Sequence, residues 1–213
     1  MVNPRHIAVA GNIGAGKTSL VNLLAKHYEW KVLLESVDDN PYLADFYADM
    51  KQWAFPLQIY FLNSRFRQMQ EAQTSPQTVI QDRTIYEDAH IFAENLKANG
   101  ILAERDFDTY WDIYQSMKAM TQPPDLLIYL RASVATLTSQ IARRGRDYEQ
   151  SISINYLETL NRQYEAWIEN YDESRLLILE ADKLDYVHKP EDLGYVISHI
   201  DAEFFGLFDD PNG

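Results

Sequence analysis

The feature that most constrains the fold is a glycine-rich stretch at residues 11–18, which reads GNIGAGKT and fits the pattern G-x-x-x-x-G-K-[ST]. An apolar run precedes it at residues 6–10, and a run with helical periodicity follows at residues 19–25. A strand, loop and helix in this order direct backbone N–H groups and the positive end of a helix dipole at a polyphosphate. The Lys17 charge suits the outer phosphates, and the Thr18 hydroxyl can ligate Mg²⁺. A nucleoside triphosphate site is therefore favoured over a glycine-rich turn without a ligand. The predicted nucleotide-binding residues are Gly11, Asn12, Ile13, Gly14, Ala15, Gly16, Lys17 and Thr18.

Charge and composition exclude several classes of protein. A formal net charge of −13 over 213 residues argues against binding to long nucleic acid, which needs a basic surface, but it allows basic residues to gather around a nucleotide. The absence of cysteine excludes disulfides and thiol nucleophiles. No secretory segment and no apolar run of membrane-spanning length is present, so we expect a cytoplasmic protein without membrane contact.

Short apolar runs alternate with helix-like segments along the chain, which predicts an α/β fold. Near-continuous apolar strands are typical of a parallel sheet that is covered on both faces. We expect an open five-stranded parallel sheet with helices on both faces, in a single domain over residues 1–213. The expected strands are residues 7–10, 32–34, 78–81, 126–130 and 176–179. The expected helices are residues 16–28, 53–73, 86–99, 107–120, 133–143, 154–171 and 190–205.

Acidic and basic side chains follow two of the predicted strands. Glu35 follows the second strand, and Asp82 and Arg83 follow the third. The carboxyl ends of parallel strands meet at the edge of the sheet that carries the phosphate loop. Asp82 can therefore hold Mg²⁺ and Arg83 can bind an oxyanion bidentately, although a structural ion pair is the alternative. Taken alone, Glu35 fits an ordinary solvated residue of a βα loop better than a catalytic residue.

Basic residues cluster again after the fourth strand. Arg143, Arg144 and Arg146 occupy three of four consecutive positions in an acidic chain. We expect a lid at about residues 143–151 that folds over the transferred phosphate and excludes water. The alternative is a helix end whose positive charges are stabilised by the helix dipole.

Aromatic residues are dense between the second and third strands. Tyr47, Gln58 and Arg65 carry polar groups among rings that include Trp53. Most of these rings are expected to form core, but some could sandwich a flat ligand.

Taken together, these motifs resemble the deoxyribonucleoside kinases of the deoxycytidine, deoxyguanosine and deoxyadenosine kinase type. The resemblance covers almost the whole chain, and the segments 58–65 and 144–149 are most similar to the bacterial deoxyadenosine and deoxyguanosine kinases. Its other signatures are residues 11–18, 35–37, 82–86, Asp88, 91–93, 124–126 and 129–131. It implies a P-loop kinase fold, a homodimer and transfer of the γ-phosphate of ATP, with Mg²⁺, to the 5′-hydroxyl of a deoxynucleoside. The two similar segments favour a purine substrate.

The resemblance also implies roles for individual residues. Glu35 is the general base for the 5′-hydroxyl, while Arg83 steadies that carboxylate and the reacting phosphate. Around the acceptor, Tyr47 and Glu149 hold the sugar 3′-hydroxyl. The base is read by Gln58, Arg65 and Asp88 and packed by Trp53 and Phe92. The lid residues Arg144 and Arg146 complete the catalytic set with Lys17, and the donor base lies against Asp182, Lys183 and Leu184. The implied metal ligands are Thr18 and Asp82.

Three positions depart from the family pattern. Ser36 stands where a proline is usual, and Thr84 replaces a serine. Gln140 lies where some relatives carry a further lid arginine, for which Arg143 could compensate.

Two other functions are compatible with a phosphate loop. A thymidylate-type monophosphate kinase shares the loop and the Asp-Arg pair, but a carboxylate such as Glu35 would repel its phosphate acceptor, whereas a hydroxyl acceptor needs a base. A nucleotide-binding switch without catalysis is the second alternative, although the chain lacks the N-K-x-D signature of a GTPase.

Overall fold

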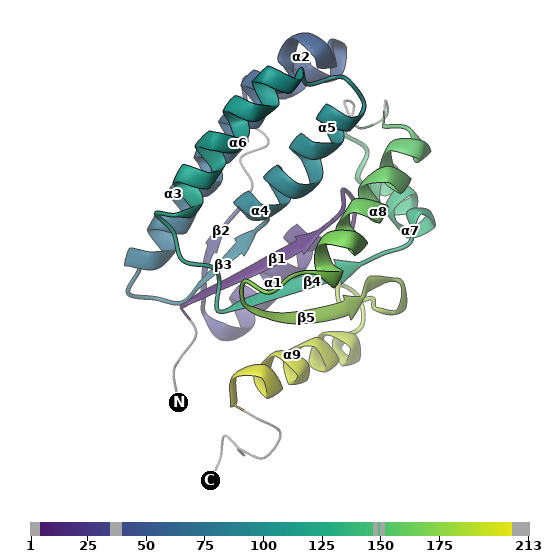
Figure 1. Cartoon of the computed structure of the whole chain (residues 1–213). Coiled ribbons are helices and arrows are strands. Elements are labelled where there is room, and N and C mark those ends of the chain that lie inside the picture. The colour runs from purple at the N-terminus through teal and green to yellow at the C-terminus, as the bar shows by residue number, and fades with distance from the viewer. Residues whose placement is uncertain (1–4, 35–39, 147–148, 150–151, 206–213) are drawn as a thin grey trace.

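A computed structural model describes residues 5–34, 40–146, 149 and 152–205 of the chain (Figure 1). Its strands form one parallel sheet in the order β2-β3-β1-β4-β5. The strands are β1 (His6–Gly11), β2 (Lys31–Leu33), β3 (Val79–Asp82), β4 (Leu126–Arg131) and β5 (Arg175–Glu180). The predicted five-stranded parallel sheet is therefore confirmed.

Helical segments connect the strands close to the predicted positions. They are α1 (Lys17–Tyr28), α2 (Leu43–Ala48), α3 (Met50–Thr74), α4 (Ile85–Glu87), the π-helical turn η1 (Asp88–Ala93), α5 (Glu94–Ala98), α6 (Glu104–Lys118), α7 (Val134–Arg144), α8 (Ile154–Glu169), the 3-10 turn η3 (Ala181–Lys183) and α9 (Pro190–Phe205). Several features differ from the expectation, and one is that the π-helical turn η1 divides the expected helix 86–99. The short helix α2 was not predicted, and α3 begins earlier because the Asp49 carboxylate accepts a hydrogen bond from the Gln52 N–H at 3.2 Å.

Alternate residues of the central strand point to opposite faces of the sheet, and both sets are apolar. Ile7 and Val9 join a core with α1, α7 and α9. Ala8 and Ala10 join a second core with η1 and α8 on the other face. Figure 1 shows α9 and α8 on these opposite sides. The period of two in a strand explains why a continuous apolar run is covered on both faces, as predicted.

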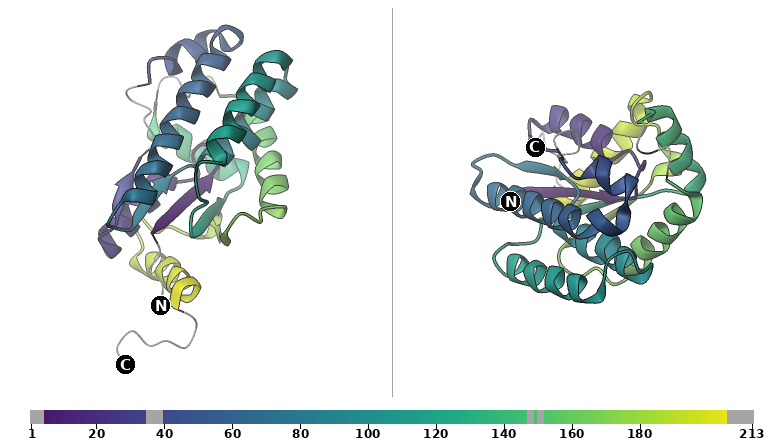
Figure 2. Two further views of the ribbon diagram at one scale, coloured as in Figure 1. Left: turned by 60° about the vertical axis from the view of Figure 1, so that its left-hand side comes forward. Right: turned by 90° about the horizontal axis from the view of Figure 1, so that it is seen from above.

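A third core joins helices α2, α3 and α6 with the segment α4–η1–α5, beside the face that carries α8. The left view in Figure 2 shows the long helix α3 next to α6, above the sheet. Among the described residues, no helix is both long and apolar enough to cross a bilayer.

The carboxyl end of β1 leads directly into the glycine-rich loop. Asp82, the last residue of β3, pairs with Val9, and Leu130 of β4 pairs with Gly11. This register brings the ends of three neighbouring strands to one edge of the sheet, where ligands bind in open α/β folds.

Candidate active site

The glycine-rich loop adopts a backbone shape that side chains would prevent. Gly14 and Gly16 have φ angles of 84° and 93°, in the left-handed region. A Cβ atom on Gly14 would lie 2.8 Å from the Leu137 carbonyl oxygen, and one on Gly16 would overlap the Tyr186 hydroxyl. That hydroxyl donates to the Gly16 carbonyl oxygen at 3.2 Å and so fixes the entry into α1.

The Asn12 side chain ties the loop to α8. Its Nδ2 donates to the Leu157 carbonyl oxygen at 3.1 Å and to Asn161 Oδ1 at 2.6 Å. Its Oδ1 accepts from the Ile13 N–H at 2.7 Å. The loop is thus anchored by a side chain before any ligand binds, which reduces the ordering needed for phosphate binding.

The Lys17 ammonium lies inside the loop. Nζ donates to the carbonyl oxygens of Gly11 at 2.9 Å and Asn12 at 3.0 Å, and the residue is buried. The positive charge is therefore held where the phosphates of a nucleotide in this loop would meet it.

Thr18 and Asp82 form a pair suited to Mg²⁺. Thr18 Oγ1 donates to Asp82 Oδ2 at 2.5 Å, and the buried Asp82 Oδ1 has no hydrogen-bond partner within the described part of the chain. The same part holds no cluster of three or more His, Cys, Asp or Glu side chains that could cage a metal. The donor set fits Mg²⁺, which usually binds through one or two protein oxygens, water and substrate phosphates.

Arg83 is placed by an unusual backbone conformation. Its φ angle is 74°, which is rare for a non-glycine residue and is a form of strain found at functional sites. Its N–H donates to the Val9 carbonyl oxygen at 3.0 Å. The guanidinium lies 4.5 Å from the centre of the Phe92 ring, and Nη1 donates to the Tyr164 hydroxyl at 3.1 Å.

One cavity of about 580 Å³ joins the loop to the aromatic region and the basic cluster. The predicted site residues that line it are Ile13, Gly14, Gly16, Lys17, Thr18, Tyr47, Gln58, Asp82, Arg83, Asp88, Phe92, Arg144, Arg146 and Glu149. Segments that are far apart in the sequence therefore share a space large enough for a small-molecule ligand.

At the apolar end of this cavity, α3 and η1 present polar groups. Gln58 and Arg65 lie seven residues apart on one face of α3, and the Gln58 Oε1 atom is buried without a hydrogen bond to any described residue. The Arg65 guanidinium is fully buried, with Nε 3.6 Å from Asp88 Oδ2. Arg65 thus lies behind Asp88, which lines the cavity itself.

The basic cluster meets a buried carboxylate. Arg144 donates to Glu149 from both Nε, at 3.0 Å, and Nη2, at 2.5 Å. Arg146 Nη1 lies 3.6 Å from Glu149 Oε1. Gln140 and Arg143 also line the cavity, three residues apart on α7. The fork geometry orients the Arg144 side chain toward the cavity edge.

Sequence comparison decides the family. The profile of the family described as deoxynucleoside kinase matches residues 7–205. The chain belongs to the deoxynucleoside kinase family. The predicted resemblance is confirmed, and so is the prediction that the protein is a kinase.

Alignments with relatives of known activity cover most of this kinase. A deoxyguanosine kinase of Lactobacillus acidophilus is 40% identical over 203 residues, which are 91% of this chain and 88% of that protein. A deoxyadenosine/deoxycytidine kinase of Bacillus subtilis is 36% identical over 197 residues, which are 91% of this chain and 90% of that protein. A deoxyadenosine kinase structure from M. mycoides with bound dATP has a TM-score of 0.81 and 32% identity, covering 92% of this chain and 98% of that one.

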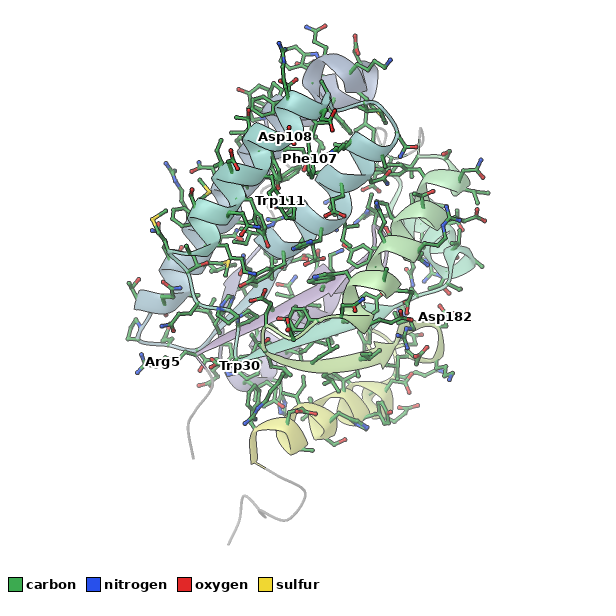
Figure 3. The ribbon with its side chains drawn as sticks, viewed as in Figure 1. Arg5, Trp30, Phe107, Asp108, Trp111 and Asp182 are labelled. Carbon is green, nitrogen blue, oxygen red and sulfur yellow. The ribbon has the colours of Figure 1, made fainter. Side chains whose placement is uncertain are left out.

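Some predicted site residues of this kinase do not line the cavity. The Trp53 ring packs near Tyr42, with ring centres 6.0 Å apart. Asp182 lies at the outer edge of the sheet in Figure 3, where its Oδ1 accepts from the Ser133 N–H at 3.0 Å. Lys183 and Leu184, which follow Asp182, are also absent from the lining. Glu35, Ser36 and lid residues 147–148 and 150–151 lie outside the described residues.

Other lining residues were not predicted. Tyr156 of α8 is one of them, and burial raises the pKa of its hydroxyl to about 12, while the nearby Arg83 charge opposes that rise. No local pattern distinguishes Tyr156 from the other aromatic residues of α8. The remaining unpredicted lining residues are Ser19, Leu34, Leu43, Phe46, Leu57 and Phe61.

Proposed function

We propose that this deoxynucleoside kinase transfers the γ-phosphate of ATP to the 5′-hydroxyl of deoxyadenosine or deoxyguanosine. The observation that carries the proposal is one continuous cavity that runs from the glycine-rich loop to the Gln58 and Asp88 side chains. One end offers backbone donors and positive charge to a triphosphate, and the other offers polar groups between aromatic rings to a base.

The polar groups at the base end suit a purine. Asp88 can accept a hydrogen bond from the exocyclic amine of adenine, while the Gln58 amide can both donate and accept. Among the relatives, the Lactobacillus acidophilus protein is a deoxyguanosine kinase and the Bacillus subtilis protein is a deoxyadenosine/deoxycytidine kinase. The M. mycoides deoxyadenosine kinase was solved with dATP and also with the products dCMP and dCDP. The ranking of bases is therefore the property to measure.

Phosphoryl transfer depends mainly on positioning and charge stabilisation. In our proposal Lys17 and the loop N–H groups hold the phosphates, and Arg83, Arg144 and Arg146 stabilise the negative charge of the transferred group. Thr18 and Asp82 would hold Mg²⁺, which neutralises phosphate charge when it is bound.

The acceptor nucleoside needs a general base for its 5′-hydroxyl and side chains that bind its sugar. We assign proton removal from the 5′-hydroxyl to Glu35, whose preceding residue, Leu34, lines the cavity. We assign the 3′-hydroxyl to Tyr47 and Glu149, which line the same cavity. Trp53 would act on the base indirectly, through the aromatic cluster around Tyr42.

Several further features remain proposals from the sequence. We propose that residues 1–213 form a single domain that works as a cytoplasmic homodimer, and that the lid spans about residues 143–151. The segment Asp182–Leu184 would face the donor base. Sedimentation of the purified protein would test the dimer, for which a monomer at assay concentration is the contradicting result.

The acceptor class tests the proposed function. Purified protein is incubated with ATP, Mg²⁺ and either deoxyadenosine, dAMP or TMP, with Lys17→Ala as the inactive control. We expect 5′-monophosphate from deoxyadenosine and little diphosphate from either nucleotide. Diphosphate formation alone would instead support a thymidylate-type monophosphate kinase, and ATP binding without transfer would support a switch.

A further inference from the structure

A fully buried carboxylate, Glu87, lies between the glycine-rich loop and Arg83, and none of the roles above uses it. Its Oε1 accepts from the Gly11 N–H at 3.2 Å, and its Oε2 accepts from the Thr84 N–H at 3.0 Å. Burial raises the pKa of Glu87, while the charges of Arg83 and Lys17 oppose that rise. The carboxylate therefore joins the first residue of the loop to the segment that follows β3.

Tyr164 of α8 extends this connection to Arg83. The Arg83 Nη1 donates to the Tyr164 hydroxyl at 3.1 Å, and that hydroxyl donates to Glu87 Oε1 at 2.9 Å. The direct separation of Arg83 Nη1 and Glu87 Oε1 is 4.0 Å. A chain of hydrogen bonds thus runs from the guanidinium to the Gly11 N–H through two side chains that do not line the cavity.

The long arginine side chain needs such support to act at a fixed point. Arg83 starts from a strained backbone, and its guanidinium lies over the Phe92 ring. The bond from Nη1 to the buried Tyr164 hydroxyl fixes the plane of the guanidinium. The Tyr164 and Phe92 rings both pack in the core between β1, β4 and α8, so both contacts of the guanidinium are fixed. Long charged side chains otherwise retain considerable rotamer freedom.

We propose that Glu87 and Tyr164 are positioning residues that hold the Arg83 guanidinium at a set distance from the phosphate loop. The guanidinium and the loop can then contact the same transferred phosphoryl group. The inference rests on the role given to Arg83 in the proposed function. In a reaction driven by positioning, a displacement of about 1 Å can lower the rate about 10²-fold. A carboxylate that only stabilised the fold would not produce a rate effect that depends on Arg83.

The decisive variant is Tyr164→Phe, which removes the hydroxyl and keeps the ring. Tyr114→Phe is the matched control, because Tyr114 is also buried and its hydroxyl contacts His90 Nε2, at 3.2 Å, away from the cavity. We expect kcat of Tyr164→Phe to fall about 10- to 100-fold with little change in KM for either substrate. The Tyr114→Phe control should keep the parent kcat, and the two variants should show similar losses in Tm.

Coupling to Arg83 is measured with a double-mutant cycle. If Tyr164 acts through Arg83, then Tyr164→Phe should cause no further loss of kcat in an Arg83→Ala background. Glu87→Gln should lower kcat in the same way, because an amide NH₂ cannot accept bonds from all the donors around it. If Glu87→Gln does not fold, the kcat of Tyr164→Phe in the two backgrounds still tests whether the hydrogen-bond chain positions Arg83.

Two results would overturn the inference. One is a Tyr164→Phe enzyme that melts earlier but keeps the parent kcat. The other is a Tyr164→Phe change that lowers kcat by the same factor in the parent enzyme and in the Arg83→Ala enzyme. An Arg83→Ala enzyme with the parent kcat would instead contradict the proposed function itself.

Discussion

The Lys17 side chain is held in the phosphate loop in a position suited to bind a phosphate. Its ammonium is buried in the loop, and two loop carbonyl oxygens satisfy its donors. A buried charge needs such partners, because desolvation is otherwise costly. A bound triphosphate would offer it full negative charges in place of dipoles, which favours binding of the anion.

Replacing this charge should stop the reaction. We expect Lys17→Ala to lose nearly all turnover, since the Lys17 ammonium is held at the Gly11 and Asn12 carbonyl oxygens inside the loop, while the circular dichroism spectrum stays that of the parent. Steady-state rates and spectra of both proteins provide the check. Near-normal turnover in a folded variant would contradict the assignment of the phosphate loop.

The general base is the second residue-scale prediction. Glu35→Gln removes the basic oxygen and keeps the shape of the side chain. We expect a rate loss of about 10²–10⁴, the usual contribution of a positioned base, with ATP binding retained. Rates across a pH series and ATP titrations measure the two properties. An unchanged rate and pH profile would show that Glu35 takes no part in the proton transfer.

Asp88 carries the prediction about the base. Because Asp88 lines the cavity in front of the buried Arg65, Asp88→Ala should lower kcat/KM for deoxyadenosine and alter the ranking of nucleosides. If the pair is only an ion bridge, the same change should cost several kcal/mol of stability, about 3–5, and leave the ranking unchanged.

Rates with four deoxynucleosides and a melting temperature separate the two outcomes for Asp88. Glu94→Gln is the matched control, because Glu94 follows η1 and pairs with His90, at 3.6 Å, outside the cavity. The control should retain the parent ranking. An Asp88→Ala enzyme that melts earlier with its ranking intact would refute the role given to Asp88.

At the scale of elements, a chain of side-chain hydrogen bonds ties β1 to β3 and α3. His6 Nε2 donates to Gln81 Oε1 at 2.8 Å, and Gln81 Nε2 donates to Gln68 Oε1 at 3.0 Å. Gln68 Nε2 then donates to the carbonyl oxygen of Leu34, which lines the cavity, at 2.7 Å. The chain links the strand ahead of the phosphate loop to the residue that precedes Glu35.

Protonation of His6 should lower the stability of the folded protein, because the charged imidazole is buried. Burial lowers the pKa of His6 from 6.5 to about 4, although the Gln81 bond and the Asp125 charge oppose the shift. The unfolded chain therefore binds the proton more readily than the folded protein, so stability falls as the pH drops from about 6.5 to about 4. At about 1.4 kcal/mol per pKa unit, this loss is at most about 3.5 kcal/mol.

Denaturant unfolding of the parent and His6→Gln at several pH values measures the effect. The variant keeps an amide donor for Gln81 but has no titratable group at position 6. We expect the two stability curves to converge as the pH falls from 6.5 toward 4. Parallel curves would show that His6 contributes nothing to the pH dependence.

The strands and the longer helices could be predicted because their signals are local. The apolar runs in β1 and β4, for example, are buried on both faces, as their composition indicates. Helix α2 could not be predicted in this way, because no side chain caps its start and its Leu43 and Phe46 are buried only by packing against the third core. The π-helical turn depends on a shifted bond from the Glu94 N–H to the Ala89 carbonyl oxygen, which residue composition does not reveal.

The candidate site was predictable where a motif or a family resemblance marks it, as for Lys17, Asp82 and Arg83. Glu87 shows the limit of this approach. Its capping-box pattern with Thr84 indicates a helix start, but its bond to the Gly11 N–H joins positions 76 residues apart. Tyr164 is similar, since its partner Glu87 lies 77 residues away.

At the scale of the whole molecule, charge is distributed unevenly. The chain carries a formal net charge of −13, yet Lys17, Arg83, Arg143, Arg144 and Arg146 all line one cavity. A positively charged pocket in an acidic protein focuses the field on a small anion such as ATP while the outer surface repels nucleic acid. This distribution agrees with a kinase that acts on free nucleosides.

The most direct measurement is kcat/KM for deoxyadenosine, deoxyguanosine, deoxycytidine and thymidine with ATP and Mg²⁺, determined separately and in competition. We expect both purine deoxynucleosides to be phosphorylated at the 5′-hydroxyl and to exceed both pyrimidines, because Asp88 and Gln58 present groups that match a purine edge. A parent enzyme that prefers deoxycytidine or thymidine would contradict the purine assignment, and one that phosphorylates none of the four would contradict the proposed reaction.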